Sequence, residues 1–206
     1  MGNAKSVSAL VCWLILAISA TPASVRASDM YSTNPASSWT DVLSEVRVGI
    51  TAHDVSGRFL PVQESPTNWK FDQITDTSFD VLFKSPKLMV FQWMGNPRPN
   101  LGGTIDFARN ESLFHAALTW HAQLFDSRFY VEGSFGGAAH TGYLTDPPPG
   151  YHALGCRVNF YEVFAAGVDL TDNLTATLDW EHTSNAGLCP PNQGLTNVGV
   201  RIGYKF

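Results

Sequence analysis

Most of this 206-residue chain alternates apolar residues with polar residues or glycine at a period of two. In the last stretch, Val198, Val200 and Ile202 alternate with Gly199 and Arg201. Successive side chains of a β-strand point to opposite faces of the sheet, so this period predicts strands with one apolar face. We expect about eight strands and no helix of useful length, the strands lying at residues 45–54, 78–83, 98–109, 113–124, 129–139, 156–171, 174–184 and 196–206.

The lengths of these strands favour a membrane barrel over two soluble folds. Several approach the ~9–11 residues that a tilted transmembrane strand needs, and the chain ends on an aromatic residue, Phe206, as interface girdles do. Charged residues such as Glu132, Glu181 and Arg201 fall on the polar faces, where they could form a network in a narrow lumen. A soluble sandwich and a lipocalin-like barrel with its polar faces outward are the alternatives. The sequence predicts an all-β fold, namely an eight-stranded antiparallel transmembrane β-barrel.

The N-terminal residues have the pattern of a secretory signal peptide. A basic residue, Lys5, precedes an apolar run from Ala9 to Ala20, and small residues continue to Ala27. We therefore expect a signal peptide at residues 1–27 and a single outer-membrane barrel domain at residues 28–206. No later stretch approaches the ~20 apolar residues of a membrane-spanning helix. The net charge of −5, without a basic stripe, argues against nucleic-acid binding.

Two cysteines, Cys156 and Cys189, lie beyond the expected cleavage site. An even number of cysteines in an oxidising compartment indicates a disulfide, and the alternative is two buried thiols. If the barrel starts and ends in the periplasm, the odd-numbered strands run outward. The start of the sixth strand and the loop between the seventh and eighth then share the outer rim. This placement favours pairing of the two cysteines.

The seventh predicted strand carries a possible catalytic pair. His182 and Ser184 end an otherwise apolar face that also holds Leu178 and Trp180. An imidazole beside a hydroxyl is the pairing that serine hydrolysis needs, because the imidazole must take the hydroxyl proton as the oxygen attacks. If this face looks toward lipid, the substrate is a lipid. On its own, a histidine two residues from a serine is more often ordinary sheet surface.

The residues around this pair resemble the PagL family of lipid A deacylases, and the resemblance covers roughly the last 35 residues. It rests on one compact run of residues, His182, Ser184, Asn185, Ala186 and Gly187, followed by Pro191, Asn192 and Gly194. The resemblance implies an eight-stranded outer-membrane barrel that hydrolyses the ester at the 3-position of lipid A and releases a 3-hydroxy fatty acid. It also implies Ser184 as nucleophile, His182 as base, and oxyanion or substrate-binding roles for Asn185, Gly187 and Asn192.

The sequence departs from the family at one position. The family's acid lies at the start of the last strand, where this chain has Thr196. The alternation places Thr196 on the same face as His182, so a hydroxyl could orient the imidazole but could not stabilise its cation as a carboxylate does. Losing the acid in a serine hydrolase costs on the order of 10⁴ in rate. Two hypotheses therefore stand: a carboxylic ester hydrolase whose triad acid is replaced by Thr196, and a non-catalytic structural barrel.

The remaining histidines give no metal site. His115 and His121 share a strand face but are six residues apart, roughly 20 Å at the rise of a strand, so they cannot bind one ion. We expect no metal and no cofactor. The expected partner is lipid A or lipopolysaccharide of the outer leaflet, and the oligomeric state is left open.

Overall fold

The computed structural model describes residues 39–206 except residues 57, 64 and 109. The chain divides into two units, residues 1–33 and residues 34–206, and the structure describes the second of them. The expected signal peptide at residues 1–27 lies outside the described residues. Within those residues, no helix is long and apolar enough to cross a membrane.

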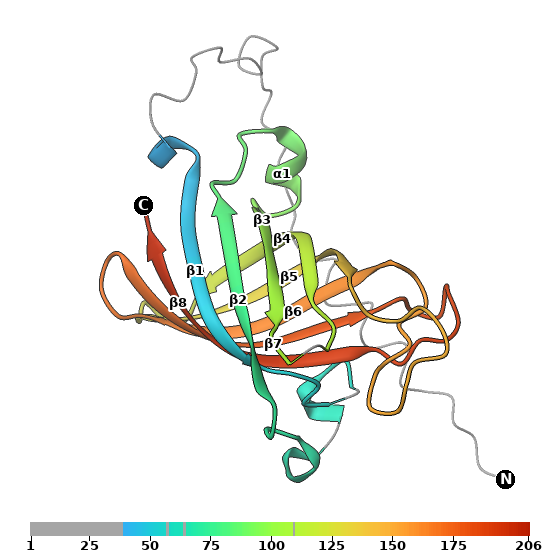
Figure 1. Ribbon diagram of the computed structural model, residues 1–206. Helices are drawn as coiled ribbons and strands as arrows, with labels where there is room; N and C mark the ends of the chain where they lie inside the picture. Colours follow the sequence, from blue (N-terminus) through green and yellow to red (C-terminus); the bar gives the residue numbers. More distant parts are fainter. Residues whose placement is uncertain (1–38, 57, 64, 109) are drawn as a thin grey trace, which may run out of the picture. The chain divides into compact units, whose positions relative to one another are not determined.

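The described part of the chain forms a closed barrel of eight antiparallel strands (Figure 1). Each strand pairs with its neighbours in the sequence, and β1 pairs with β8, which closes the barrel. This confirms the predicted fold class. The strands are β1 (Leu43–Ala52), β2 (Ile74–Phe83), β3 (Arg98–Asp106), β4 (Leu113–Gln123), β5 (Phe129–His140), β6 (Val158–Asp169), β7 (Leu174–Ser184) and β8 (Leu195–Lys205).

The strand boundaries differ most from the prediction in the first third of the barrel. Strand β1 begins and ends two residues earlier than expected, and β2 begins at Ile74 rather than at residue 78. The apolar run after Pro86 contains the short helix α1 (Met89–Trp93). Short 3-10 helices occur at Trp39–Asp41 (η2), Pro61–Gln63 (η3) and Pro66–Asn68 (η4). All of them lie in connections or before β1, so the barrel wall is made of strands alone.

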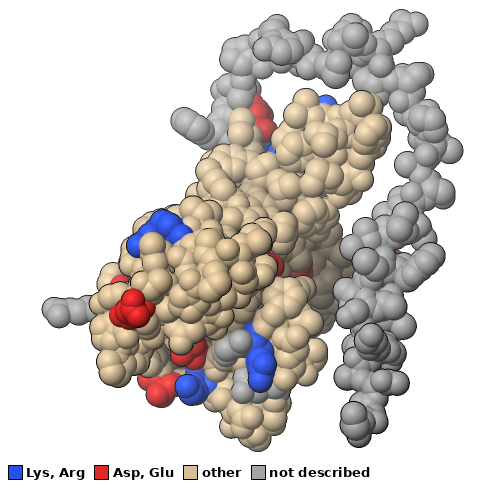
Figure 2. All heavy atoms as spheres, turned by 90° about the vertical axis from the view of Figure 1, so that its right-hand side faces the viewer, with Lys and Arg blue, Asp and Glu red and all other residues tan. Residues whose placement is uncertain are grey.

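The alternating faces resolve into an apolar outside and a polar inside. Val48, Ile50 and Val200 point outward and are each more than half exposed. Their neighbours Thr51 and Arg201 point inward and are buried. Figure 2 shows one side of this surface, where the wall is largely uncharged and the charged atoms lie mainly toward its ends. A soluble sandwich or a lipocalin-like barrel would place the polar faces outside, so this sidedness excludes both alternatives.

Buried ion pairs fill the middle of the barrel. The Arg201 guanidinium donates to Asp80 at 2.8 Å and to Glu181 at 2.9 Å, and its Nη2 lies 3.1 Å from Asp179. Tyr161 also donates its hydroxyl to Glu181, at 2.9 Å. The polar faces of four different strands thus meet at one arginine, as the charges on those faces predicted.

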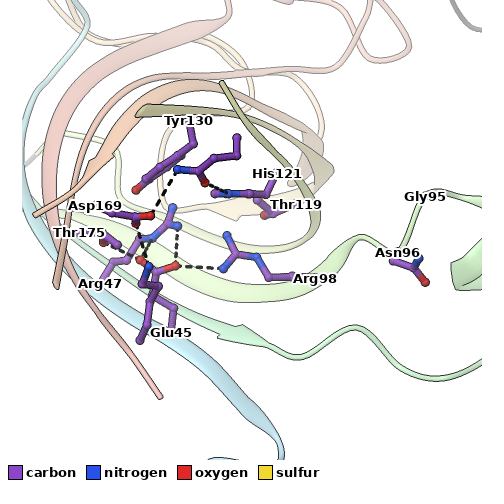
Figure 3. Close-up of a pocket in the computed structure, with 12 residues that line it drawn as sticks. Glu45, Arg47, Gly95, Asn96, Arg98, Thr119, His121, Tyr130, Asp169 and Thr175 are labelled. Atoms are coloured by element: carbon purple, nitrogen blue, oxygen red, sulfur yellow. Dashed lines mark hydrogen bonds and ion pairs between the residues drawn. The ribbon is translucent and has the colours of Figure 1, made fainter. Parts of the chain in front are cut away.

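A second network lies nearer the end where the chain enters β1. The Arg47 guanidinium donates to Glu45 and Glu132 at 2.6–3.0 Å. Arg98 also donates to both carboxylates, and Figure 3 shows its bond to Glu45. Glu45, Arg47 and Arg98 line a cavity of about 270 Å³ that also includes His121. A carboxylate or guanidinium buried without a partner is costly, so the reciprocal pairing is what allows this interior to be charged.

The connections differ in length at the two ends of the barrel. The β1–β2, β5–β6 and β7–β8 connections, at residues 53–73, 141–157 and 185–194, lie at one end, which we call the long-loop end. The short turns after β4 and β6, at residues 124–128 and 170–173, lie at the other end, together with the β2–β3 connection at residues 84–97 that contains α1. His182 and Ser184 are at the long-loop end of β7, where the long connections can reach them.

Candidate active site on the outer wall

The barrel register brings His182 and Thr196 together. Strands β7 and β8 pair these two residues directly, and both side chains point outward. The distance from His182 Nδ1 to Thr196 Oγ1 is 2.7 Å. Thr196 therefore occupies the position from which a triad acid holds the imidazole.

The hydrogen bonds around Thr196 fix the tautomer of His182. Thr196 Oγ1 lies 3.0 Å from the carbonyl oxygen of Arg58, which can only accept. The hydroxyl has one proton and donates it to that carbonyl, so it must accept from the Nδ1–H of His182. Nε2 is then left unprotonated, which is the state that a general base requires.

Ser184 lies on the same outward face, two residues along β7 and opposite Phe160 of β6. No hydrogen bond joins Ser184 to His182 within the described part of the chain. Such bonds are often long in unliganded hydrolases and tighten when substrate binds. The structure therefore places Ser184 and His182, the expected nucleophile and base, as neighbours on one face without joining them.

The β1–β2 connection covers this site from outside the barrel. The Val55 N–H donates to the carbonyl of Thr196 at 2.8 Å, and the Trp180 indole donates to the carbonyl of Phe59 at 3.1 Å. The Phe59 ring meets the His182 ring edge-on, with centroids 5.5 Å apart. His182 is consequently only 4% exposed. Trp180, which lies on the same apolar face as His182, is covered by the same connection.

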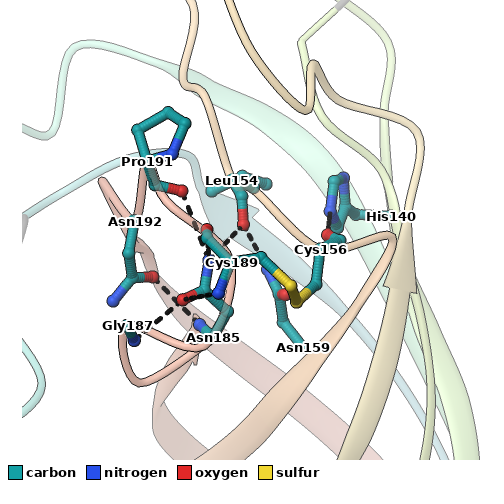
Figure 4. Close-up of a disulfide and its surroundings, with 9 residues drawn as sticks. All are labelled: His140, Leu154, Cys156, Asn159, Asn185, Gly187, Cys189, Pro191 and Asn192. Atoms are coloured by element: carbon teal, nitrogen blue, oxygen red, sulfur yellow. Dashed lines mark hydrogen bonds between the residues drawn. A yellow bond between two sulfur atoms is a disulfide. The ribbon is translucent and has the colours of Figure 1, made fainter.

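The β7–β8 loop is held by the side chain of Asn185 (Figure 4). Its amide nitrogen donates to the carbonyls of Leu154 and Cys189 at 2.9 and 2.7 Å. Its amide oxygen accepts from the Gly187 N–H at 2.8 Å. Asn185 thus shapes the loop, and the expected oxyanion donor at Gly187 is already engaged.

Asn192 is arranged differently. Its side-chain oxygen accepts from the Asn185 N–H at 2.9 Å, which turns its amide nitrogen away from the loop (Figure 4). Asn192 is exposed, so this nitrogen is free to meet a ligand. Of the three expected oxyanion or substrate-binding residues, Asn192 is the one whose donor points outward.

The two cysteines are joined. Cys156, just before β6, and Cys189, in the β7–β8 loop, form a disulfide with their Cα atoms 5.3 Å apart (Figure 4). The bridge ties the loop that carries Asn192 to the strand that pairs with β7. The disulfide predicted from the shared rim is present.

A groove lies beside Ser184 on the outer wall. Its volume is about 210 Å³, and its lining is mostly apolar, from Gly137, Val158, Phe160 and Leu188. Phe160 is the residue that pairs with Ser184, so the groove begins next to the hydroxyl.

Glu162 is a site residue that the sequence analysis missed. It is the β6 residue that pairs directly with His182, on the side of the imidazole away from Thr196. It lies in an outward row of otherwise apolar residues with Phe160 and Phe164. The sequence does carry a signal for Glu162, because it is an acidic residue in a row of side chains that faces away from the lumen.

A separate cluster at the long-loop end was also missed. His53 Nδ1 lies 2.9 Å from Asp76, and its Nε2 lies 3.2 Å from Glu111. Burial lowers the pKa of His53, but the hydrogen bonds and charges of the two carboxylates outweigh it and raise the pKa to about 10. Ligand atoms of His53, Asp76 and Asp106 fall within 4.8 Å of one another, as a metal site would need. Both ring nitrogens are already paired with carboxylates, so the cluster is an ion-pair clamp between the end of β1, strand β2 and the β3–β4 loop.

The other two histidines considered from the sequence point into the lumen. His115 stacks on Tyr161 and lies 3.1 Å from Asp80, and His121 lies 3.0 Å from Glu132. They belong to the buried networks rather than to the outer site.

Comparison with known proteins identifies a family and a fold that this chain resembles. Residues 67–205 match the family described as lipid A 3-O-deacylase (PagL). No curated protein sequence matches the chain. Among solved structures, the crystal structure of the outer membrane enzyme PagL superposes with a TM-score of 0.53 at 16% identity, covering 79% of this chain and 100% of that one. A de novo designed transmembrane β-barrel aligns over 81% of this chain and 96% of its own, with a TM-score of 0.44 at 10% identity.

The family match spans β2 to β8 and includes His182, Ser184, Asn192 and Thr196. The chain belongs to the PagL family of lipid A 3-O-deacylases.

Proposed function

We propose that this protein is an outer-membrane serine esterase that removes the ester-linked 3-hydroxy acyl chain from the 3-position of lipid A. The observation that carries the proposal is the hydrogen-bond chain from His182 Nδ1 through Thr196 to the Arg58 carbonyl. It leaves the basic nitrogen of His182 free on the face that holds Ser184. The family match supports lipid A as the substrate.

The apolar outer wall supports the membrane address. Exposed aliphatic and aromatic side chains cover the strands, while the charges are buried in the lumen. Transmembrane barrels show this sidedness, because lipid cannot solvate charged groups. With the long loops outside, Ser184 lies at the level of the outer leaflet, where lipid A is found.

In the proposed reaction, Ser184 Oγ attacks the ester carbonyl while His182 Nε2 takes the hydroxyl proton. The Asn192 amide nitrogen donates to the oxyanion that develops on the carbonyl. His182 then returns the proton to the leaving sugar oxygen, and water releases the acyl chain from Ser184. The acyl chain lies in the groove beside Phe160, whose apolar lining suits it.

A non-catalytic barrel of the same fold is the second candidate, and one observation favours it. In the described part of the chain, no carboxylate contacts His182 Nδ1, and Phe59 covers the ring. A non-catalytic barrel needs neither a carboxylate partner for His182 nor an uncovered imidazole ring.

Mass spectrometry of lipid A separates the two candidates. The wild-type chain, expressed in a host whose lipid A carries a 3-O-linked acyl group, should remove one 3-hydroxy acyl chain. The Ser184→Ala and His182→Ala variants should leave lipid A intact while still migrating on gels as folded, heat-modifiable barrels. Unchanged lipid A with the wild-type protein, or full deacylation by Ser184→Ala, contradicts the proposal.

A further inference from the structure

One carboxylate, that of Glu162, lies among apolar side chains on the outer wall. The outward residues of β6 around it are apolar: Val158, Phe160 and Phe164 surround Glu162. An ionisable side chain on the lipid side of a barrel is costly, so its presence points to a function. Glu162 Oε2 is buried and has no hydrogen-bond partner among the described residues. This carboxylate therefore has no structural partner to explain it.

The register places this carboxylate beside the proposed base. Strand β6 pairs Glu162 with His182, and β8 pairs Thr196 with His182, so the three side chains form one row across three strands. Directly opposite residues of antiparallel strands have Cβ atoms roughly 4.5–5.5 Å apart. Thr196 holds Nδ1 from the β8 side, and Glu162 is the neighbour of His182 on the β6 side.

The surroundings of Glu162 and His182 strengthen the electrostatic effect of a charge in this row. Phe59 lies against both His182 and Phe164, with ring centroids 5.5 and 5.6 Å away, and it keeps water from the row. Electrostatic interactions are stronger where water is excluded. Among the described residues of β6, β7 and β8, Glu162 is the only acidic side chain that points outward. The nearby acids Asp179 and Glu181 point into the lumen, where they are paired with Arg201.

We propose that Glu162 supplies the negative charge that stabilises the imidazolium of His182 during ester hydrolysis. This inference rests on the proposed function. The two roles of a triad acid are then divided: Thr196 orients the ring and fixes its tautomer, and Glu162 provides the countercharge. As Ser184 attacks, its proton moves to His182 Nε2 and later to the leaving sugar oxygen. Glu162 neither gains nor loses a proton, and it acts through His182 without touching the substrate.

A double-mutant cycle between Glu162 and Thr196 tests this division. Glu162→Gln should lower kcat on the order of 10²-fold with KM nearly unchanged, because the loss of a complete triad acid costs on the order of 10⁴ and Thr196 still orients the ring. Glu162→Asp should retain most of kcat. Thr196→Glu should restore activity in the Glu162→Gln background by a larger factor than it changes the wild type, since it returns a carboxylate to the same imidazole.

The pH profile adds a readout that packing alone would not move. Without the carboxylate the base loses its proton more readily, so the acidic limb of kcat should shift to lower pH in Glu162→Gln. Asp172→Asn, which removes one negative charge from the exposed β6–β7 turn, is the matched control and should leave kcat and its pH profile unchanged. Heat-modifiable migration verifies that each variant is folded.

Three results would overturn the inference. The first is wild-type kcat with an unshifted pH profile in Glu162→Gln. The second is an equal loss in Glu162→Asp without rescue by Thr196→Glu, which would indicate a packing role. The third is a wild-type protein without deacylase activity, which removes the proposed function and this inference with it. An active wild type that depends on Ser184 but is indifferent to Glu162 overturns the inference alone.

Discussion

A threonine hydroxyl can take over the orienting role of an acid because it both accepts and donates a hydrogen bond. Thr196 accepts from the His182 ring and donates to the backbone carbonyl of Arg58. Thr196 and His182 are both buried, so neither bond is exchanged with water. Removing the hydroxyl leaves the buried Nδ1–H of His182 without a partner, which costs more than the loss of one ordinary hydrogen bond.

Thr196→Val should therefore lower kcat by roughly 5- to 100-fold, since a buried unsatisfied group costs about 1–3 kcal/mol. The barrel should remain folded because valine has nearly the same shape as threonine. Release of 3-hydroxy fatty acid from lipid A vesicles measures the rate. Thr196→Ser keeps the hydroxyl and should stay close to wild type. Equal rates for the valine and serine variants would show that the relay does not orient His182.

At the scale of elements, the β1–β2 connection covers His182 and shields the candidate site from the outside. It folds back over β7 and β8 and is held by a backbone bond from Val55 to Thr196 and by the rings of Phe59 and Trp69. Trp69 packs on Trp180 with ring centroids 5.1 Å apart. The β1–β2 connection is thus anchored at both ends, and His182 lies beneath its middle.

Phe59→Ala should expose His182. Its modification by diethyl pyrocarbonate, followed by peptide mass spectrometry, should become several-fold faster because the free Nε2 loses its aromatic cover. Phe125→Ala, in the β4–β5 turn at the opposite end of the barrel, is the control and should leave the rate unchanged; Phe125 is 96% exposed. Equal rates in wild type and Phe59→Ala would mean that the ring does not shield the base.

The ion-pair clamp at His53 predicts a pH dependence of stability. Its folded pKa of about 10 lies above the ordinary value near 6.5, so the charged form stabilises the fold. This contribution is complete below about pH 6.5 and disappears as the pH rises through about 10. The difference in thermal unfolding temperature between wild type and His53→Gln should be constant at acidic pH and should shrink from pH 7 to 10. A difference independent of pH would contradict the clamp.

The elements that were predicted from the sequence are those encoded by local pattern. A period of two predicts a strand and its faces wherever it occurs, so β4, β5, β7 and β8 were found within a residue or so of their ends. The cover over His182 was not foreseen, because residues 56–75 have the composition of a polar loop, and the docking of such a loop is a tertiary contact. Glu162 was missed because no faces were assigned along the sixth strand, so its acidic residue was never compared with His182.

At the scale of the whole molecule, the barrel is stabilised from inside by charge. Arg201 joins carboxylates from β2 and β7, and Arg47 and Arg98 join Glu45 and Glu132 across the opposite half of the lumen. The outward faces gain little from packing against lipid, since lipid tails are as apolar as the side chains. The ion pairs in the lumen therefore do much to determine which strands become neighbours in the barrel.

Arg201→Met should destabilise the barrel by about 3–5 kcal/mol, because it leaves Asp80, Asp179 and Glu181 buried without their cation. The midpoint of urea unfolding in detergent micelles, followed by heat-modifiable migration, measures this loss. Arg128→Met, in the exposed β4–β5 turn, is the control and should behave as wild type. Additional Asp80→Asn should recover part of the lost stability, and no change in Arg201→Met would refute the role of the network.

The filled lumen also decides how a substrate reaches Ser184. Ser184 lies on the outer wall and buried ion pairs fill the middle of the lumen, so under the proposed function encounters occur sideways, by diffusion of lipids along the leaflet. The relevant concentration is then a surface density, and the rate should follow the mole fraction of lipid A in the membrane rather than its amount per volume. Diluting lipid A with inert lipid at constant total lipid A should slow the enzyme, as expected for catalysis confined to two dimensions.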